Sequence, residues 1–398
     1  MWARKRIDIE WTDLLGGLGF LFMPVPPPFA GQIGERICPA SDTSGGLVAC
    51  LTERSGFDLL LKALAWPTED EILVSAVTIN DMVRIVEEHD LVPVPIDIDP
   101  SNMEPRMGAI EAAVTDRTRA ILVAHLFGTI CPMDAIIAWA RPRGILVFED
   151  CAQAYDGEYQ GHPESDVVMF SFGPIKTATA LGGGLLKVRD DKLCERMNML
   201  HAKYPRQART VFARRVFTFT MLKTIAGRLP FRLLIAACRL LRRDHDTLLN
   251  NSVKNVSGDF FQEIRQQPSG PLLRMMRRRI RNFDRRRVEQ RAAKGRRLAE
   301  ILTPLVTCPG SAASSHSYWI FLAQFDDRKN VVDLLCRTGF DATAGTALCP
   351  VKPPDSRPEL DPVGARQSLE KALHLPVYPE MPDREIERLG QTIVKTLT

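Results

Sequence analysis

Two chemically useful side chains, Lys176 and Asp150, stand where apolar runs of the sequence end. Lys176 follows Val167-Val-Met-Phe-Ser-Phe172, and Asp150 closes Ile145-Leu-Val-Phe-Glu-Asp150. Short apolar runs rich in β-branched and aromatic residues predict buried strands. Because ligands bind at the carboxyl ends of the strands in open α/β sheets, we expect these stretches to bring an amine and a carboxylate to one sheet edge.

An amine and a carboxylate at one sheet edge suit pyridoxal phosphate (PLP). The lysine forms a Schiff base with the aldehyde, and the carboxylate keeps the pyridine nitrogen protonated, so that the ring accepts electrons. Gly182–Gly184 would let the chain pass close to the cofactor. We therefore predict Lys176 as the Schiff-base residue and Asp150 as the partner of the ring nitrogen. Each residue alone has a plainer interpretation, a helix cap for the aspartate and a solvated amine for the lysine.

The elements around these residues alternate between strand and helix from about residue 47 to residue 189. The predicted strands are Glu71–Val77, Val92–Ile98, Ala120–His125, Ile145–Asp150, Val167–Phe172 and Gly184–Val188, and the helices between them are Met82–His89, Met107–Val114 and Met133–Arg141. This alternation predicts a mostly parallel, doubly wound α/β sheet. Continuous apolar strands are expected when helices cover both faces.

The remaining sequence predicts a smaller C-terminal unit after a basic helical region. Leu273, Met276, Ile280 and Phe283 recur at helical spacing inside Arg274–Arg297, which predicts one amphipathic helix with a basic outer face. Farther on, we expect a strand at Tyr318–Phe325 and helices at Asn330–Arg337 and Arg384–Leu397. We therefore expect a large domain over residues 1–300, with an insertion at about 205–265, and a small domain over 301–398.

Several motifs in order resemble the DegT/DnrJ/EryC1/StrS family of PLP-dependent sugar aminotransferases. They are Phe170-Ser-Phe-x-Pro-x-Lys176, Glu149-Asp150-x-Ala-Gln153, Val94-Pro-Ile-Asp-Ile-Asp-Pro100, Arg117-Thr-Arg-Ala-Ile121, Val123-Ala-His-Leu-Phe-Gly128 and Leu375-Pro-Val-Tyr-Pro379. The resemblance covers roughly residues 55–188 and 268–397. It implies the fold of the fold-type I PLP-dependent transferases (aspartate aminotransferase-like), with a doubly wound large domain and a small C-terminal α/β domain.

The resemblance also implies roles for individual residues. Lys176 would move the proton and Asp150 would pair with the pyridinium nitrogen. Gln153 would contact the phenolic oxygen side of the ring, and Ser171 would bind the phosphate. Ser55, Gly56 and Phe57 would lie at the family's Ser-Gly-Thr position, where the start of a helix caps the phosphate. His125 is interpreted as a structural residue at a strand end.

This chain departs from the family's pattern in three places. Phe57 and Asp58 follow Ser55-Gly56 where the family has Thr, and an acid that points into a phosphate site is unfavourable. Around residues 77–79 the chain offers only aliphatic residues where the family often has a stacking aromatic ring. Gln266-Gln-Pro-Ser-Gly270 lies where the family has an Asn-x-Arg-Met stretch that serves the cofactor across the dimer. These departures put substrate recognition in question rather than the cofactor.

Residues 211–243 interleave apolar side chains with Arg and Lys. Such a stretch fits either a helical hairpin packed on its own protein or a dimer partner, or a peripheral contact with an anionic membrane surface. Nucleic acid is not expected as a partner of the Arg-rich stretch Arg274–Arg297, because the chain has no recognised nucleic-acid fold and few aromatic residues stand beside these arginines. Acidic residues before the apolar residues 14–25 argue against a secretory signal.

Composition limits the remaining possibilities. The chain has 398 residues, a net charge of +4, nine cysteines without a CxxC pair and seven histidines without HxxxH spacing. An odd number of scattered cysteines favours a reducing compartment, so we expect a cytoplasmic protein without a metal site.

We expect a homodimer and, as the activity, transfer of an amino group from an amino-acid donor to a keto or aldehyde acceptor. The acceptor could be a nucleotide-linked sugar. The alternatives are the same chemistry on a lipid-linked or hydrophobic substrate at a membrane, and a non-catalytic member of the fold.

Overall fold

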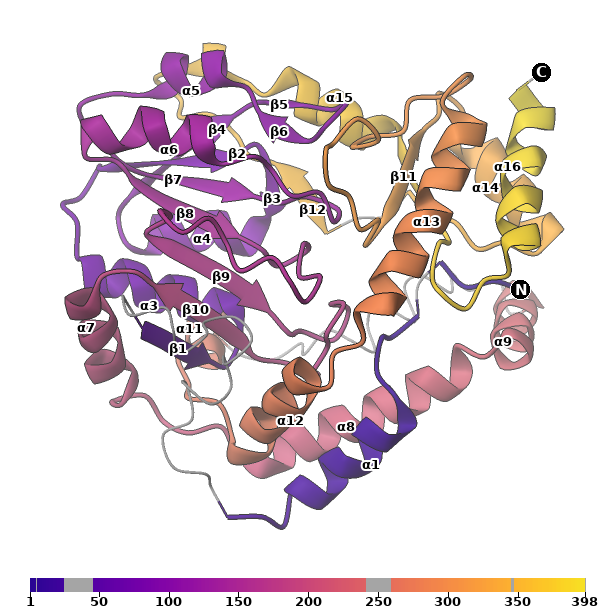
Figure 1. Ribbon diagram of the computed structural model, residues 1–398, viewed down its shortest axis with the longest axis horizontal. Helices are drawn as coiled ribbons and strands as arrows, with labels where there is room; N and C mark the ends of the chain where they lie inside the picture. Colours follow the sequence, from indigo (N-terminus) through magenta and orange to yellow (C-terminus); the bar gives the residue numbers. More distant parts are fainter. Residues whose placement is uncertain (5, 25–45, 241–258, 345–346, 398) are drawn as a thin grey trace.

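The computed structural model describes residues 1–4, 6–24, 46–240, 259–344 and 347–397 around a seven-stranded sheet (Figure 1). The strand order is β1-β10-β9-β8-β7-β2-β4. The strands are β1 (Gly46–Cys50), β2 (Glu71–Ser75), β4 (Val92–Ile96), β7 (Thr118–Ala124), β8 (Leu146–Asp150), β9 (Val167–Ser171) and β10 (Gly184–Val188). β9, β8, β7, β2 and β4 are parallel, and β10 is antiparallel to both of its neighbours. The predicted α/β class with a mostly parallel sheet is confirmed.

Helices cover both faces of this sheet. They are α3 (Glu53–Leu64), α4 (Asn80–Glu88), α5 (Met107–Ala113), α6 (Asp134–Ala140) and α7 (Asp191–His201). Side chains of α3, α4 and α7 share a core with Leu122 and Phe148, whereas those of α5 and α6 pack with Ile121 and Val147. Neighbouring strand residues thus point to opposite, equally apolar layers, which explains the continuous apolar strands.

The basic helical region differs from its prediction. A single helix does not span residues 274–297, because α12 (Gly270–Arg281) ends and α13 (Arg285–Leu302) begins at Asp284, whose side chain accepts from the Arg286 N–H. An aspartate is well suited to cap a helix start. The outer face of α12 is not open either, since α1 (Trp11–Phe20) packs along it. The prediction of one amphipathic helix with an open basic face is therefore wrong, because the region forms two helices and α1 covers α12.

The predicted insertion contains three described helices. They are α8 (Arg209–Ile225), α9 (Arg228–Leu240) and α11 (Phe260–Ile264). Residues 241–258, which include the end of the 211–243 stretch, lie outside the described residues. None of the described helices combines the length and the apolar character that crossing a membrane requires.

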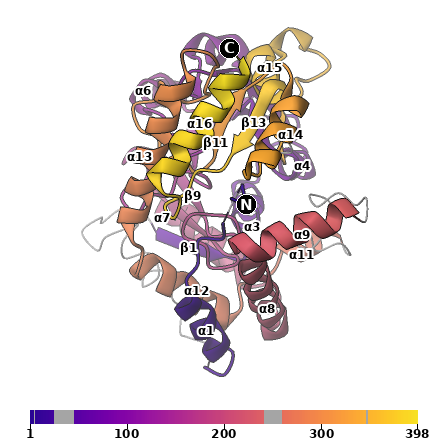
Figure 2. The same cartoon turned by 90° about the vertical axis from the view of Figure 1, so that its right-hand side faces the viewer.

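The C-terminal unit contains a two-stranded antiparallel sheet beside α13 (Figure 2). Its elements are β11 (Phe321–Gln324), β13 (Ala372–Leu375), α14 (Arg328–Thr338) and α16 (Asp383–Leu397). β11 is shorter than the predicted strand, because Tyr318 adopts a left-handed backbone with φ of 47°. Trp2 lies in the core of this unit, so the first residues of the chain pack with its last hundred. The division at residue 300 stays a prediction, since α13 also packs against α16.

Short elements connect the two units. They are β3 (Val77–Ile79), β5 (Ile98–Asp99), β6 (Glu104–Pro105), β12 (Leu348–Pro350), α15 (Val363–Lys371) and two 3-10 turns at Arg141–Arg143 and Pro358–Leu360. β12 pairs with β3, directly after β2. This pairing places a segment of the C-terminal region beside the strand ends of the large sheet.

Candidate active site

Lys176 and Asp150 lie beyond the carboxyl ends of neighbouring parallel strands. Asp150 is the last residue of β8, and its Oδ1 accepts from the Ala152 N–H at 2.9 Å. Ser171 ends β9, and the loop that follows returns to β10 through a hydrogen bond of 2.9 Å between Phe172 N and Gly183 O. Lys176 lies in this loop, where its N–H donates to Gly173 O at 3.0 Å.

Glu53 adds a second carboxyl group to this pair. Burial raises the pKa of Glu53 well above its ordinary value, and the charge of Asp150 and a hydrogen bond with it act in the same direction. Burial lowers the pKa of the Lys176 amine, opposed by the charges of Glu53 and Asp150. Glu53 is therefore the acid that keeps its proton, and it donates this proton toward Asp150.

A tryptophan from the C-terminal unit covers Lys176. The Lys176 Nζ lies 4.8 Å from the centroid of the Trp319 ring, within range of a cation–π interaction. The Trp319 Nε1 donates to Ile175 O at 3.1 Å, which ties this ring to the lysine loop. The small unit thus contributes directly to the surroundings of the amine.

Helix α3 begins earlier than its predicted phosphate-binding start. Its first residue is Glu53, and its N-cap is Thr52, whose Oγ1 accepts from the Ser55 N–H at 3.0 Å. Gly56 N already donates to Thr52 O, so the predicted Ser55-Gly56-Phe57 amides belong to the helix interior. The amides of Glu53 and Arg54 lack an acceptor four residues back and point out of the helix end. The open end of α3 thus lies at residues 52–54, and phosphate binding at Ser55, Gly56 and Phe57 stays a prediction.

Side chains in the second turn of α3 serve the fold. Phe57 is fully buried in the core between α3 and the sheet, and a Cβ on Gly56 would meet the Leu186 Cδ1 at 2.1 Å. Asp58 points away from the helix start, because it accepts from Arg265 Nε at 3.0 Å and contacts the His89 Nε2 at 3.1 Å. The expected conflict between Asp58 and a phosphate therefore does not arise.

The start of α3 lies against β10 and Ser171. A Cβ on Gly184 would come within 2.4 Å of the Glu53 nitrogen, so only glycine allows this approach. Gly184 pairs with Ser171 in the sheet. Because directly paired residues project to the same face of a sheet, Ser171 projects to the face on which the start of α3 lies. Its hydroxyl and the Glu53 and Arg54 amides are donors of the kind that could hold a phosphate.

A recess beside Asp150 has apolar walls. It is lined by Val74, Ser75, Thr78, Met82, Val83, Leu122, Ala124 and Asp150. It is small, with a volume of about 10 Å³ that suits one water molecule, and among the described residues the buried Glu53 Oε1 has no hydrogen-bond partner. The residues present therefore fit pyridoxal phosphate, with the carboxylate, the amine and the helix start each on a different segment. Aliphatic side chains take the place of a stacking aromatic ring, as the sequence around residues 77–79 predicts.

Gln153 lies beside these groups, but its carbonyl oxygen is already used. The Phe127 N–H donates to Gln153 Oε1 at 2.8 Å, and Phe127 itself has a left-handed backbone with φ of 57°. Gln153 thus stabilises an unusual turn after β7. Its contact with the ring stays a prediction.

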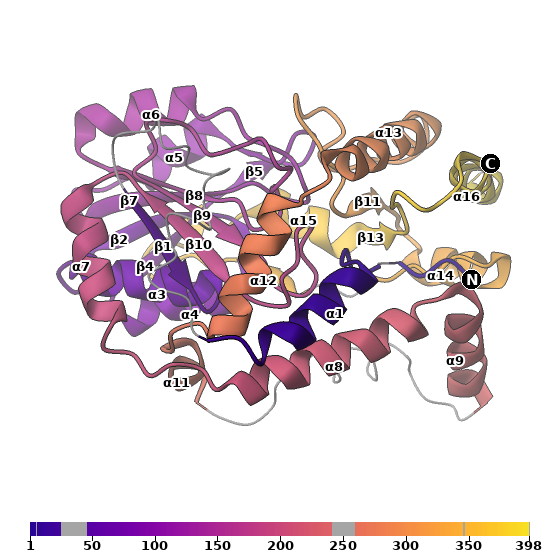
Figure 3. The same cartoon turned by 60° about the horizontal axis from the view of Figure 1, so that its bottom comes forward.

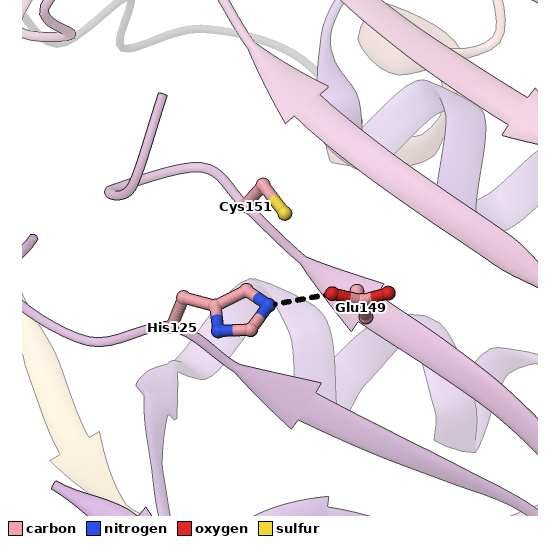
Figure 4. Close-up of side chains that lie close together, drawn as sticks. All are labelled: His125, Glu149 and Cys151. Carbon is pink, nitrogen blue, oxygen red and sulfur yellow. Dashed lines mark hydrogen bonds and ion pairs between the residues drawn. The ribbon is translucent and has the colours of Figure 1, made fainter. Parts of the chain in front are cut away.

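A buried polar group of His125, Glu149 and Cys151 lies at the ends of two neighbouring strands (Figure 4). His125, Glu149 and Cys151 hold potential ligand atoms within 4.8 Å of one another. His125 Nδ1 accepts from the Cys131 N–H at 3.0 Å, so the ring proton is on Nε2, which lies 2.9 Å from Glu149. Tyr159 also donates to Glu149, and burial raises the pKa of the Cys151 thiol to about 12.

The hydrogen-bond partners of His125 and Glu149 are buried or partly buried, which is typical of a structural network. Glu149 and Cys151 flank Asp150 in the chain, so fixing both side chains fixes the carboxylate between them. His125 lies directly after β7 with both ring nitrogens in buried contacts, and its structural role stays a prediction. That no metal is needed stays a prediction.

Residues 48–222 match the sequence profile of the DegT/DnrJ/EryC1/StrS aminotransferase family. The matched residues include Lys176, Asp150 and the start of α3. GDP-perosamine synthase of Caulobacter vibrioides is 33% identical over 159 residues, which are 39% of this chain and 43% of that protein. The chain spans about half the length of the curated relatives that it matches.

Solved structures extend the likeness in fold beyond the family segment. The aminotransferase TlmJ of Streptoalloteichus hindustanus matches with a TM-score of 0.71 at 18% identity, over 99% of this chain and 98% of that one. NtdA of Bacillus subtilis, solved with bound cofactor PMP, matches with a TM-score of 0.70 at 18% identity, over 97% and 83%. The predicted fold-type I architecture is confirmed over nearly the whole chain.

Sequence reasoning missed Thr52, Glu53, Arg54 and Trp319. A threonine directly before an apolar helical pattern is a recognised N-cap signal, so Thr52 could have been found. Glu53 and Trp319 carried no comparable signal, because their positions at the site depend on how separate segments pack.

Proposed function

We propose that the protein is a PLP-dependent aminotransferase, which moves an amino group from an amino-acid donor to a keto or aldehyde acceptor. The convergence of Lys176 with Asp150 and Glu53 at the strand ends is the observation that carries this proposal. The family of residues 48–222 supports it independently. When bound, PLP supplies an electron sink for the carbon that loses or gains the amine.

The residues of the chain have separate tasks in this reaction. The Lys176 amine holds the cofactor and carries the proton at Nζ, and burial favours its neutral form. Asp150 keeps the ring nitrogen protonated, while Ser171 and the amides of Glu53 and Arg54 hold the phosphate. Trp319 limits the access of water to the amine from the side of the C-terminal unit.

The acceptor that we propose is a nucleotide-linked keto sugar, with glutamate or glutamine as the donor. The name of the Caulobacter relative, GDP-perosamine synthase, supports a sugar substrate. The same chemistry on a lipid-linked or hydrophobic acceptor at a membrane is the second candidate. It is favoured by the outer side of α8, where the Phe217 side chain is 72% exposed.

We place the protein in the cytoplasm as a homodimer. The odd number of scattered cysteines supports a reducing compartment. Ile175, directly before the reactive lysine, leaves 47% of its surface exposed, and a partner subunit would cover such an apolar side chain.

The test of the proposed activity is spectroscopic. Wild-type protein mixed with PLP should acquire the yellow absorbance band of a lysine-bound cofactor, which Lys176→Ala should lack. The exchange of amino groups should fall by about 10²–10⁴-fold or more in the variant. Lys329→Ala, at an exposed lysine of α14, is the matched control and should keep both signals.

Absence of the band in well-folded wild-type protein would contradict the proposal and favour a non-catalytic member of the fold. The acceptor is then identified with the amine-loaded enzyme. Keto sugars and keto lipids are added in turn, and the return of the yellow band reports which of them takes the amine.

A further inference from the structure

Helix α1 carries an exposed apolar stripe on the side opposite to its packed face. Trp11, Leu15 and Leu18 of α1 are 48%, 67% and 44% exposed. Phe22, in the turn directly after the helix, continues their spacing of three to four residues and is 88% exposed. Asp13, Leu14 and Gly17 are buried on the other face. An apolar stripe normally faces a core, so this helix has one apolar face more than the described residues of the chain cover.

The packing of α1 presents this stripe rigidly. Asp13 of α1 accepts from two residues of α12. Its Oδ1 accepts from Arg278 Nε at 2.7 Å, and Arg279 also forms an ion pair with it. A Cβ on Gly17 would lie 2.7 Å from Met275 Cε, so α1 is seated closely on α12. The stripe therefore cannot turn inward without breaking a buried ion pair.

Helix α8 lies beside α1 in antiparallel orientation (Figure 3). The Lys223 Nζ, near the end of α8, is 5.6 Å from the Trp11 ring, and Arg209 Nη1, at its start, donates to Leu21 O at 2.8 Å. α8 also has a second apolar side, where Phe217 is 72% and Met221 is 45% exposed. Leu229 and Leu233 of α9 continue this pattern with exposed fractions of 67% and 61%.

The charges of α8 and α9 are all of one sign, whereas α1 has one exposed acid, Glu10, at its start. No Asp or Glu occurs between Glu195 and Asp244, whereas Arg209, Arg214, Arg228 and Arg232 are exposed on α8 and α9. A twofold contact through this surface would place arginines against arginines. An anionic lipid surface complements both the apolar stripe and the cations.

We propose that α1, α8 and α9 form a peripheral docking surface for anionic phospholipid membranes. The α1 stripe enters the boundary between head groups and acyl chains, and the arginines of α8 and α9 meet the lipid phosphates. This surface goes beyond the proposed transamination and does not depend on it. It brings the enzyme to the membrane whether its acceptor is soluble or lipid-linked.

Vesicle flotation of the full-length, PLP-loaded protein tests the docking surface. The protein should float with vesicles of equal parts phosphatidylcholine and phosphatidylglycerol, and much less with phosphatidylcholine alone. Leu15→Ser with Phe22→Ser should weaken binding by about tenfold or more. Arg214→Gln with Arg232→Gln should weaken it by about fivefold for each arginine at low salt.

Matched controls lie elsewhere on the surface. Met199→Ser with Leu305→Ser removes apolar side chains that are 63% and 45% exposed, and it should leave flotation unchanged. Failure of the wild-type protein to float with anionic vesicles overturns the proposal, as does full binding by the stripe variant. Equal flotation with both vesicle types overturns the anionic assignment.

Light scattering distinguishes a protein partner from a membrane. The proposal would be overturned if the wild type does not float with vesicles and the Leu15→Ser, Phe22→Ser variant has a lower molecular mass in solution than the wild type. That combination would assign the stripe to a contact between copies of the chain. These readouts are independent of the absorbance band, so the docking surface and the proposed activity fail or succeed separately.

Discussion

Glu53 places a neutral acid against Asp150 at the point where a cofactor nitrogen is expected. Its folded-state pKa is raised above the ordinary value of 4.5, chiefly by burial. Above that pH the unfolded chain has released this proton, whereas the folded protein retains it. Stability therefore falls as pH rises, until the folded carboxyl also ionises.

Glu53→Gln removes this pH dependence, because an amide cannot ionise. In cofactor-free protein, the wild type should lose up to about 1.4 kcal/mol per pH unit through this group, and the variant should not. The midpoint of thermal unfolding, measured from mildly acidic to neutral pH, should therefore decline less steeply in the variant. Glu370→Gln, at an exposed glutamate of α15, should follow the wild type. Parallel curves for wild type and Glu53→Gln would contradict a neutral Glu53.

Lys176 and Asp150 were predictable at the residue scale, whereas Glu53 and Trp319 were not. Both predicted residues end apolar runs, and parallel strands bring their ends to one edge by topology alone. Glu53 reaches Asp150 because β10 lies close to α3 at Gly184, and Trp319 reaches Lys176 across two units. Such approaches depend on packing between distant segments, which no local pattern encodes.

At the scale of elements, the contact between β10 and α3 sets the position of the phosphate site. Gly184→Ala would place a methyl group 2.4 Å from the Glu53 nitrogen and 2.5 Å from the Thr52 carbonyl carbon. Backbone atoms cannot move aside cheaply, so we expect a loss of about 1–3 kcal/mol. Titration with PLP, followed by absorbance, should also show weaker binding, since the helix start shifts.

Gly108→Ala is the matched control for this substitution. Gly108 lies in α5, and nothing lies within 4 Å of the position of its Cβ. Alanine favours a helix over glycine by up to about 1 kcal/mol, so the control should be slightly stabilised and bind PLP normally. Equal behaviour of the two variants would show that the approach of β10 to α3 tolerates a side chain.

The elements themselves were predicted unevenly, for physical reasons. Strands buried on both faces produce continuous apolar runs that stand out from their surroundings, and six of these were placed correctly in outline. Helix α1 was missed because it is apolar on two sides and lacks the usual alternation of faces. The basic region was predicted as one long helix because its apolar residues keep helical spacing across Asp284. In the structure Asp284 caps the start of α13 and so divides the region into two helices.

At the scale of the whole molecule, the first 24 residues connect the two units. Trp2 forms a bridge with Phe340 in the C-terminal unit, and α1 packs on α8 and α12 of the large unit (Figures 1 and 2). Arg4 adds a bidentate pair with the buried Asp341. The relative placement of Trp319 and Lys176, which belong to different units, therefore depends in part on the N-terminal segment.

Trp2→Ala tests this connection, because the Trp2 side chain is 5% exposed and its Nε1 donates to Glu385 at 2.8 Å. Removing a buried tryptophan costs about 3–5 kcal/mol, so the midpoint of thermal unfolding should fall clearly. Trp11→Ala removes the same group from a position that is 48% exposed, and it should change the midpoint much less in the absence of lipid. If the N-terminal segment sets the approach of the two units, Trp2→Ala should also raise the exposure of Trp319 to a soluble quencher, which Trp11→Ala should not. If Trp2→Ala lowers the midpoint of unfolding but leaves the quenching of Trp319 unchanged, Trp2 stabilises only the core of the C-terminal unit and does not influence the site.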